Sequence, residues 1–172
     1  GRNLLVKWVI IRDYYHQLVN PKRKILAILF ELKYDPPVGE IVKLSKNVST
    51  ILGPNASPMT FRGTQTYLIG EGNEVAIIDP GPKNHSHLQA IARALRGKQL
   101  IAILITHSHV DHSPLGKEIS DKHNVPIYAF GETGKGKSEI MRKYTEKFEI
   151  GGGEGVDPLF KPDVLISTGD HI

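Results

Sequence analysis

Four side chains of the kinds that bind metal ions fall within six residues, directly after the continuously apolar stretch Leu100–Ile105. They are His107, His109, Asp111 and His112. In extended backbone, residues i and i+2 point the same way, so His107 and His109 can bind one cation together. Asp111 and His112 then project from the turn that follows. Imidazole and carboxylate donors suit zinc best, with iron or manganese also possible, whereas the alternative is a polar surface loop.

The composition narrows the chemistry further. The chain has 172 residues, 40% of them hydrophobic, which predicts one domain with a packed core. It has no cysteine, which excludes a disulfide-stapled secreted protein and any thiolate metal site, and leaves its eight histidines as nitrogen ligands. The net charge of +4 is too small to indicate nucleic-acid binding by itself.

Elements that could position the four ligands can be read from the periodicity. Alternating and apolar runs predict strands, with a hairpin across residues 64–79, and the strand over residues 100–105 should be buried on both faces. Period 3.6 predicts helices, one of which begins with Ser113 as cap followed by Pro114. The predicted strands are 48–52, 64–69, 75–78, 100–105, 127–130 and 164–166, and the predicted helices are 84–96, a helix from 113, and 138–150. This order indicates an α/β layered domain with the ligands at the carboxyl end of a buried strand.

The other histidines are not expected to bind metal. His85 and His87 begin a predicted helix, where capping or solvent-facing roles are expected. His16 and His123 fit helix surfaces, and His171 has no partner in the sequence.

Residues 1–34 differ in pattern from the remainder and form a predicted N-terminal extension, with a helix over 3–19 and a helix or strand over 24–33. The apolar runs Leu4–Ile11 and Ile25–Phe30 are much shorter than the roughly 20 residues that a membrane-spanning helix needs. We therefore expect no membrane segment and a cytoplasmic location.

A second motif lies at Gly131–Ser138, which fits the phosphate-loop pattern G-x-x-x-x-G-K-S letter for letter. It predicts backbone amides around a nucleotide phosphate, with Lys137 on the phosphates and Ser138 on magnesium. A Gly- and Lys-rich rim of the metal site is the alternative.

The neighbouring basic residues fit either a solvated helix face or attraction of an anionic substrate such as RNA or a coenzyme A thioester. These residues are Lys135, Lys137, Arg142, Lys143 and Lys147. The aromatics Tyr144 and Phe148 have core spacing and are not expected to stack on bases.

The segment Thr106–His112 resembles the signature of the metallo-β-lactamase-fold hydrolases. Gly63–Gly70 resembles the first hairpin of their glyoxalase-II-like and endoribonuclease-like branches, and Ala76–Gly81 resembles their first acidic motif. Val164–Asp170 is similar to the strand and turn before the next metal-binding histidine of the family. The resemblance covers roughly residues 35–172 and implies an αβ/βα sandwich.

The resemblance also implies roles for individual residues. His107 and His109 would bind a first zinc ion, and Asp111 and His112 a second one. Asp79 would steady the loop that contains the histidines (residues 106–112, the histidine loop) without binding the metal itself. Asp111 would in addition orient the water that becomes the nucleophile, a metal-bound hydroxide. The implied activity is zinc-dependent hydrolysis of an ester, thioester or phosphodiester.

In that family the remaining ligands come later in the chain than residue 172. We therefore expect residues 35–172 to be the N-terminal half of the sandwich, inactive or incomplete alone, with the missing C-terminal half or self-association completing it. The substrate, a small molecule or a nucleic acid, stays undecided. The alternatives are a non-catalytic metal-binding fragment and a nucleotide-binding protein acting through Gly131–Ser138.

Overall fold

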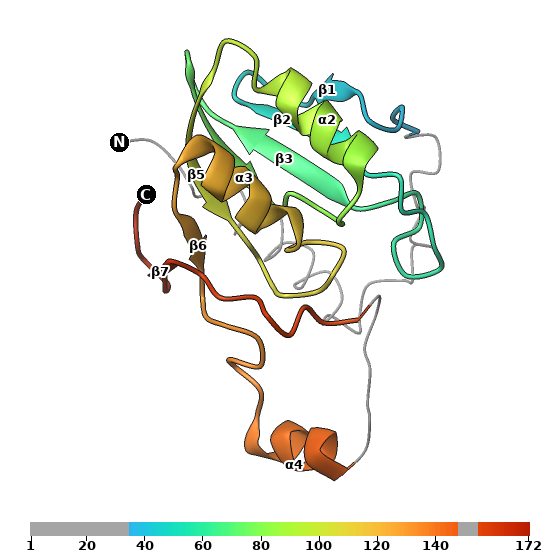
Figure 1. Ribbon diagram of the computed structural model, residues 1–172, viewed down its shortest axis with the longest axis vertical. Helices are drawn as coiled ribbons and strands as arrows, with labels where there is room; N and C mark the ends of the chain where they lie inside the picture. The colour runs from blue at the N-terminus through green and yellow to red at the C-terminus, as the bar shows by residue number, and fades with distance from the viewer. Residues whose placement is uncertain (1–34, 148–154) are drawn as a thin grey trace, which may run out of the picture. The chain divides into compact units, whose positions relative to one another are not determined.

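The computed structural model describes residues 35–147 and 155–172, which contain seven strands and three helices (Figure 1). The expected elements over residues 3–19 and 24–33 and the N-terminal extension lie outside the described residues. In chain order the elements are β1 Ile41–Lys43, β2 Val48–Leu52, β3 Gln65–Ile69, β4 Glu74–Ile78, α2 His85–Ala94, β5 Gln99–Leu104, α3 Leu115–His123, β6 Ile127–Ala129, α4 Glu139–Lys147 and β7 Val164–Leu165.

All seven strands form one mixed sheet, in which the spatial order β1 to β7 is the same as the order in the chain. β1 to β4 pair antiparallel, and β4 to β7 pair parallel. The predicted hairpin is confirmed, since β3 and β4 pair with Tyr67 opposite Ile78 and Ile69 opposite Ala76. Gly72 in its turn has φ +66°, a conformation that glycine adopts without steric cost.

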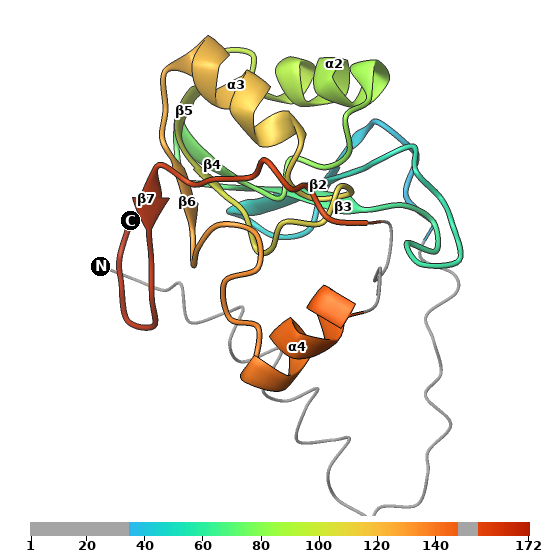
Figure 2. The same ribbon diagram turned by 60° about the horizontal axis from the view of Figure 1, so that its bottom comes forward.

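Helices α2 and α3 cover the same face of this sheet (Figure 2). Their inward residues Ile91, Leu115 and Ile119 pack against Ile77 and Ile103 of the central strands, and each of these side chains is at most 2% exposed. This cluster is the core. Burial of an aliphatic side chain contributes about 1.5–3 kcal/mol, so the core holds β4 and β5, and the loops that follow them, in fixed positions.

The opposite face of β5 departs from expectation, because the strand is not buried on both faces. Ile101 is 41% exposed. It is the extra residue at a register shift, where Val75 pairs with Leu100 and Ala76 pairs with Ala102. Because successive side chains of a strand alternate and Leu100 belongs to the core, Ile101 lies on the face that α2 and α3 do not cover.

The two covering helices begin differently. Asn84 caps α2, since its side chain accepts a hydrogen bond from the His87 amide at 3.1 Å. The predicted cap of α3 is wrong. Pro114 occupies the cap position, and the Ser113 hydroxyl instead donates to the His109 carbonyl at 3.2 Å. Ser113 therefore braces the loop that precedes the helix.

Helix α4 stands away from the sheet in both views (Figures 1 and 2). Tyr144 is 52% exposed, so the prediction that it lies at a core position is wrong, and the apolar Ile140 on the same helix is 67% exposed. The period of 3.6 correctly indicates an amphipathic helix, but it cannot tell which surface, if any, the apolar stripe meets. Phe148 lies outside the described residues.

Within residues 35–147 and 155–172, none of the helices has the length and apolar character needed to cross a bilayer.

Candidate metal centre

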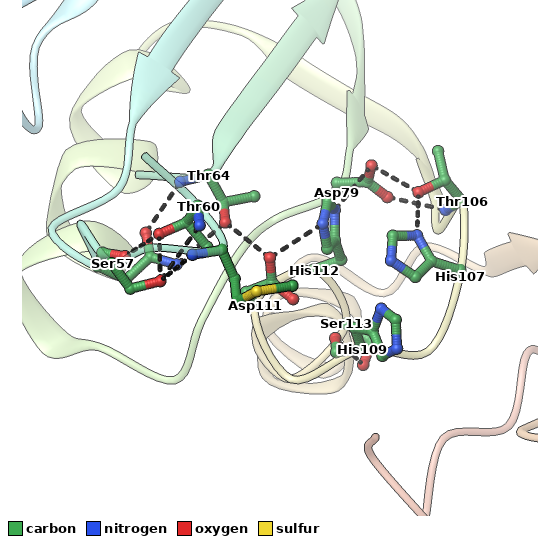
Figure 3. A network of polar contacts seen from close by, with 12 residues as sticks. Ser57, Thr60, Thr64, Asp79, Thr106, His107, His109, Asp111, His112 and Ser113 are labelled. Atoms are coloured by element: carbon green, nitrogen blue, oxygen red, sulfur yellow. Dashed lines mark hydrogen bonds and ion pairs between the residues drawn. The ribbon is translucent and has the colours of Figure 1, made fainter. Parts of the chain in front are cut away.

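The loop between β5 and α3 brings the three predicted imidazoles together. The ring centroid of His107 lies 4.6 Å from that of His109 and 4.2 Å from that of His112 (Figure 3). Asp111 is buried beside them, with its Oδ2 3.1 Å from His112 Nε2. All four residues named by the sequence motif thus share one cluster at the carboxyl end of β5.

Asp79 holds this loop from the neighbouring strand. It follows β4, which pairs parallel with β5, so the two strands end at the same edge of the sheet. Its Oδ1 accepts the Thr106 amide at 2.7 Å, and its Oδ2 accepts the Thr106 hydroxyl, also at 2.7 Å. The same Oδ2 lies 3.2 Å from His112 Nδ1. One carboxylate therefore fixes both the start of the histidine loop and one of its imidazoles.

The backbone of Asp79 is in turn held by two residues, Thr66 and His87, that sequence reasoning missed. The Thr66 hydroxyl donates to the Asp79 carbonyl at 2.8 Å, and His87 Nε2 lies 2.8 Å from that hydroxyl. A carbonyl only accepts, so the Thr66 proton goes to Asp79 and His87 Nε2–H donates to Thr66. Asp79 has φ +50°, a left-handed conformation that Asp tolerates better than most residues.

His87 corrects the expectation of a capping or solvent-facing residue, because its side chain is fully buried. Burial lowers the pKa of His87 to about 4, although the Pro80 carbonyl opposes this shift. Its Nδ1 has no hydrogen-bond partner among the described residues. The helical spacing from His87 to the buried Ala90 and Ile91 is the signal that could have located it on the inner face of α2.

Thr64, at the start of β3, supports Asp111 in a comparable way. Its hydroxyl donates to Asp111 Oδ2 at 3.0 Å. Because Oδ2 also faces His112, the Asp111 carboxylate is held between Thr64, directly before β3, and the histidine loop. Sequence reasoning missed Thr64, since the pairing spans 47 residues of chain.

The charges in the cluster shift its pKa values in different directions. Burial tends to raise the pKa of Asp79, but hydrogen bonds from His112 and Thr106 hold it below its ordinary value. Burial tends to lower the pKa of His112, but the hydrogen bond to Asp79 and the charges of Asp79 and Asp111 raise it overall. For His107, burial and then the nearby charges of His112 and His109 lower the pKa. His107 is thus neutral at pH 7, the form that can bind metal.

The donor set fits zinc in its chemistry, since it offers three imidazoles and a carboxylate. The Thr106 hydroxyl lies 3.0 Å from His107 Nδ1, which leaves Nε2 of that ring to face a ligand. Within the part of the chain that the structure describes, however, no three His, Asp or Glu side chains converge as a ready coordination sphere. Both nitrogens of His112 face carboxylates instead. Metal binding would therefore require His112 to turn from Asp111.

The glycine–lysine loop, residues 131–138, lies after β6 and before α4. Three of its backbone amides are occupied: those of Thr133, Lys135 and Lys137 donate to the carbonyls of Phe160, Glu132 and Gly134. A phosphate loop directs such amides at its ligand. Those three amides are therefore already used within the protein, and the strand before the loop and the helix after it are present.

The fold and the site together define a class, an α/β protein with a cluster of metal-type ligands at the carboxyl edge of its sheet. Comparison with known proteins makes this specific. The profile of the Metallo-beta-lactamase superfamily matches residues 59–171, which is more than half of the chain. The chain belongs to the metallo-β-lactamase superfamily.

Curated relatives share sequence over part of this region. The Beta-lactamase-like protein 2 homolog of Caenorhabditis elegans is 39% identical over 98 residues, covering 53% of this chain and 33% of the relative. The atrochrysone carboxyl ACP thioesterase of Aspergillus terreus is 36% identical over 80 residues, covering 45% of this chain and 25% of the relative. The chain thus spans about a third or less of the length of these relatives.

Solved structures agree on the fold. A subclass B3 metallo-β-lactamase of Bradyrhizobium japonicum matches with a TM-score of 0.50 and 21% identity, over 77% of this chain and 47% of that one. A metallo-β-lactamase from Elizabethkingia meningoseptica matches with a TM-score of 0.50 and 17% identity, over 80% and 50%. The mixed sheet with its helices is part of the metallo-β-lactamase fold, and the expected fold class is confirmed.

Proposed function

We propose that this chain carries one half of the active site of a zinc-dependent hydrolase that acts on an ester, a thioester or a phosphodiester. The observation that carries the proposal is the cluster of His107, His109, His112 and Asp111 at one edge of the sheet. Zinc, when bound, supplies a Lewis acid and lowers the pKa of a coordinated water to about 7.

The protein residues have separate tasks in this proposal. His107 and His109 offer the first pair of nitrogen ligands, and His112 with Asp111 offers the second. Asp79 orients His112 through Nδ1 and holds the loop through Thr106. Ligands held in this way from a neighbouring strand lose less conformational entropy when they bind a metal.

Asp111 is the candidate for orienting the attacking water. Thr64 and His112 both engage its Oδ2. The other carboxylate oxygen, Oδ1, can then accept a hydrogen bond from water or bind metal. Because Thr64 holds the carboxylate from the first hairpin, the water would be placed by a rigid part of the sheet rather than by the loop alone.

Thioesters are the first substrate class to test. The relative from Aspergillus terreus is named a thioesterase, and 80 of its residues align with this chain at 36% identity. The substrate, the two-zinc stoichiometry and completion of the site by further sequence or by a second copy of the chain are all parts of the proposal.

The decisive measurement is zinc content after dialysis, by elemental analysis, for the chain and for the double variant His107→Ala/His109→Ala. We expect zinc in the parent chain and loss of the first-site ion in the variant, since two of its nitrogen ligands are gone. His123→Ala, at the end of α3, is the matched control and should retain its zinc. Unchanged zinc in the double variant would contradict the proposal.

One alternative is a non-catalytic metal-binding fragment. The observation that favours it is the number of ligands, since three imidazoles and one carboxylate are enough for a single four-coordinate zinc ion but not for two. Incubation of the zinc-loaded 172-residue chain with an acyl thioester separates the two: turnover that His107→Ala/His109→Ala abolishes supports the hydrolase, whereas bound zinc without turnover supports the alternative.

A further inference from the structure

A pocket lies between the glycine–lysine loop and the first turns of α4, apart from the histidine cluster. Its volume is about 340 Å³, within the range of small-ligand pockets. The lining side chains are three cations, two hydroxyl groups and one carboxylate, from Lys135, Lys137, Arg142, Thr133, Thr145 and Glu132.

The three cations are the donors left for a ligand. The hydroxyl of Thr145 donates to the carbonyls of Met141 and Arg142, and that of Thr133 donates to the Asp157 carbonyl. Among the described residues, no carboxylate lies within ion-pair distance of Lys135, Lys137 or Arg142. Lys143, on the same helix, differs because it pairs with Glu139 at 2.9 Å.

Three cations against one carboxylate leave the pocket with an excess of positive charge. Like charges that share a pocket repel one another, and an anion placed between them removes that repulsion while it accepts hydrogen bonds from all three. Phosphate groups suit this role, since lysine binds them as a point charge and arginine with two donors. Here side chains would supply the contacts, since the amides of Thr133, Lys135 and Lys137 already donate to carbonyls.

Asp157 joins the pocket to the histidine loop. The Thr133 hydroxyl donates to the Asp157 carbonyl at 2.5 Å, and the Asp157 amide donates to the Ser108 carbonyl at 2.7 Å. Ser108 stands between His107 and His109. Both loops follow neighbouring parallel strands, β5 and β6, so they lie at the same edge of the sheet.

We propose that this pocket binds the phosphate or diphosphate group of a small anionic molecule. Resting on the function proposed above, we assign that molecule as the substrate, held by its phosphate end in the pocket while its scissile bond lies at the histidine cluster. Three cations clustered around one small, open pocket fit a compact phosphate group better than the long backbone of a nucleic acid, which needs a continuous basic track.

Titration calorimetry with inorganic pyrophosphate tests the pocket without any hydrolysis. EDTA in the buffer removes metal, so the result does not depend on the zinc site. We expect saturable binding that weakens by about tenfold or more in Lys137→Ala and in Arg142→Ala, because each removes a charged donor. Lys137→Arg should retain most of the affinity, since it keeps the charge.

Two controls separate this site from other sources of binding. Lys143→Ala removes the same charge from the same helix outside the pocket and should change the affinity by less than about twofold. His107→Ala/His109→Ala should bind pyrophosphate normally, and loss of binding there would place the anion at the histidine cluster and overturn the proposal.

Absence of saturable binding, or an equal effect of Lys143→Ala, would also overturn the proposal. A short single-stranded RNA that binds far more tightly than pyrophosphate, and depends on Lys137, would show that the pocket serves a polymer and refute the small-molecule assignment. Failure of the zinc measurement with intact pyrophosphate binding would leave the pocket standing and remove only its link to hydrolysis.

Discussion

The histidine loop and the glycine–lysine loop differ in how they are supported, although both follow neighbouring parallel strands and both match a sequence motif. Asp79 and Thr64 hold the histidine loop from other strands, and the helix after it packs into the core through Leu115 and Ile119. The glycine–lysine loop has hydrogen bonds within itself and, through Thr133, to Asp157 and Phe160 of the following segment, and the helix after it exposes Ile140. A motif thus specifies local residue types, whereas support from distant strands determines how firmly those residues are held.

The largest expected contrast is between one isoleucine on each helix. Ile119→Ala on α3 should lower the free energy of unfolding by about 3–4 kcal/mol, because it leaves a cavity in the core. Ile140→Ala on α4 should change it by less than about 0.5 kcal/mol, because that side chain is 67% exposed. Urea denaturation of both variants at pH 7 measures the difference, and equal losses would show that α4 packs as firmly as α3.

A smaller loss is expected when the support of the histidine loop is removed. Asp79→Asn keeps a residue that tolerates φ +50° but removes the charge that faces His112. We expect unfolding at pH 7 to cost about 3 kcal/mol less than in the parent chain, since a buried carboxylate that accepts from Thr106 and faces His112 is lost. The control is Asp121→Asn, whose exposed pair with Lys117 should contribute less than about 0.5 kcal/mol. A similar loss in both variants would mean that Asp79 does not support the loop specifically.

The smallest effect is a pH dependence from His87. The pKa of His87 is about 4 in the folded chain, below its ordinary value of 6.5, so between these pH values the unfolded chain binds a proton that the folded chain does not. The stability from neutral His87 is complete above pH 6.5 and is lost as the pH falls toward 4. Between pH 7 and pH 5 the parent chain should lose about 2 kcal/mol more than His87→Gln, which keeps an amide donor for Thr66.

Denaturant midpoints of the two proteins at the two pH values measure this difference. His107, whose lowered pKa acts in the same direction, is present in both proteins and cancels. Parallel pH dependences would show that His87 does not titrate in this window.

Local sequence patterns predicted most of the described fold, because the deciding contacts are close in the chain. The β3–β4 hairpin needs only two alternating runs and a turn with Gly72, and α2 begins where Asn84 can cap it. The clustering of His107, His109 and His112 could be predicted for the same reason. The predicted cap at Ser113 was wrong because its hydroxyl bonds to His109, a choice that depends on the folded loop.

The supporting residues could not be predicted from spacing alone. Thr64 lies 47 residues from Asp111, and His87 meets Asp79 through Thr66, so each contact exists only after the sheet and α2 have come together. The exposure of Ile101 and of Tyr144 was missed for a related reason. Periodicity identifies an apolar face, but it contains no information about whether another layer covers that face.

The strand order of the sheet has a consequence for assembly during synthesis. Because β1 to β7 lie in the order of the chain, no strand has to be inserted between two that are already paired. As the chain lengthens from its N-terminus, each strand can add to the edge that its predecessor has just formed. Short turns join β1 to β2 and β3 to β4, a longer segment over residues 53–64 joins β2 to β3, and α2 and α3 form the crossovers before β5 and β6. The carboxyl ends of the strands, where the histidines lie, are therefore brought together as each new strand pairs with the strand before it.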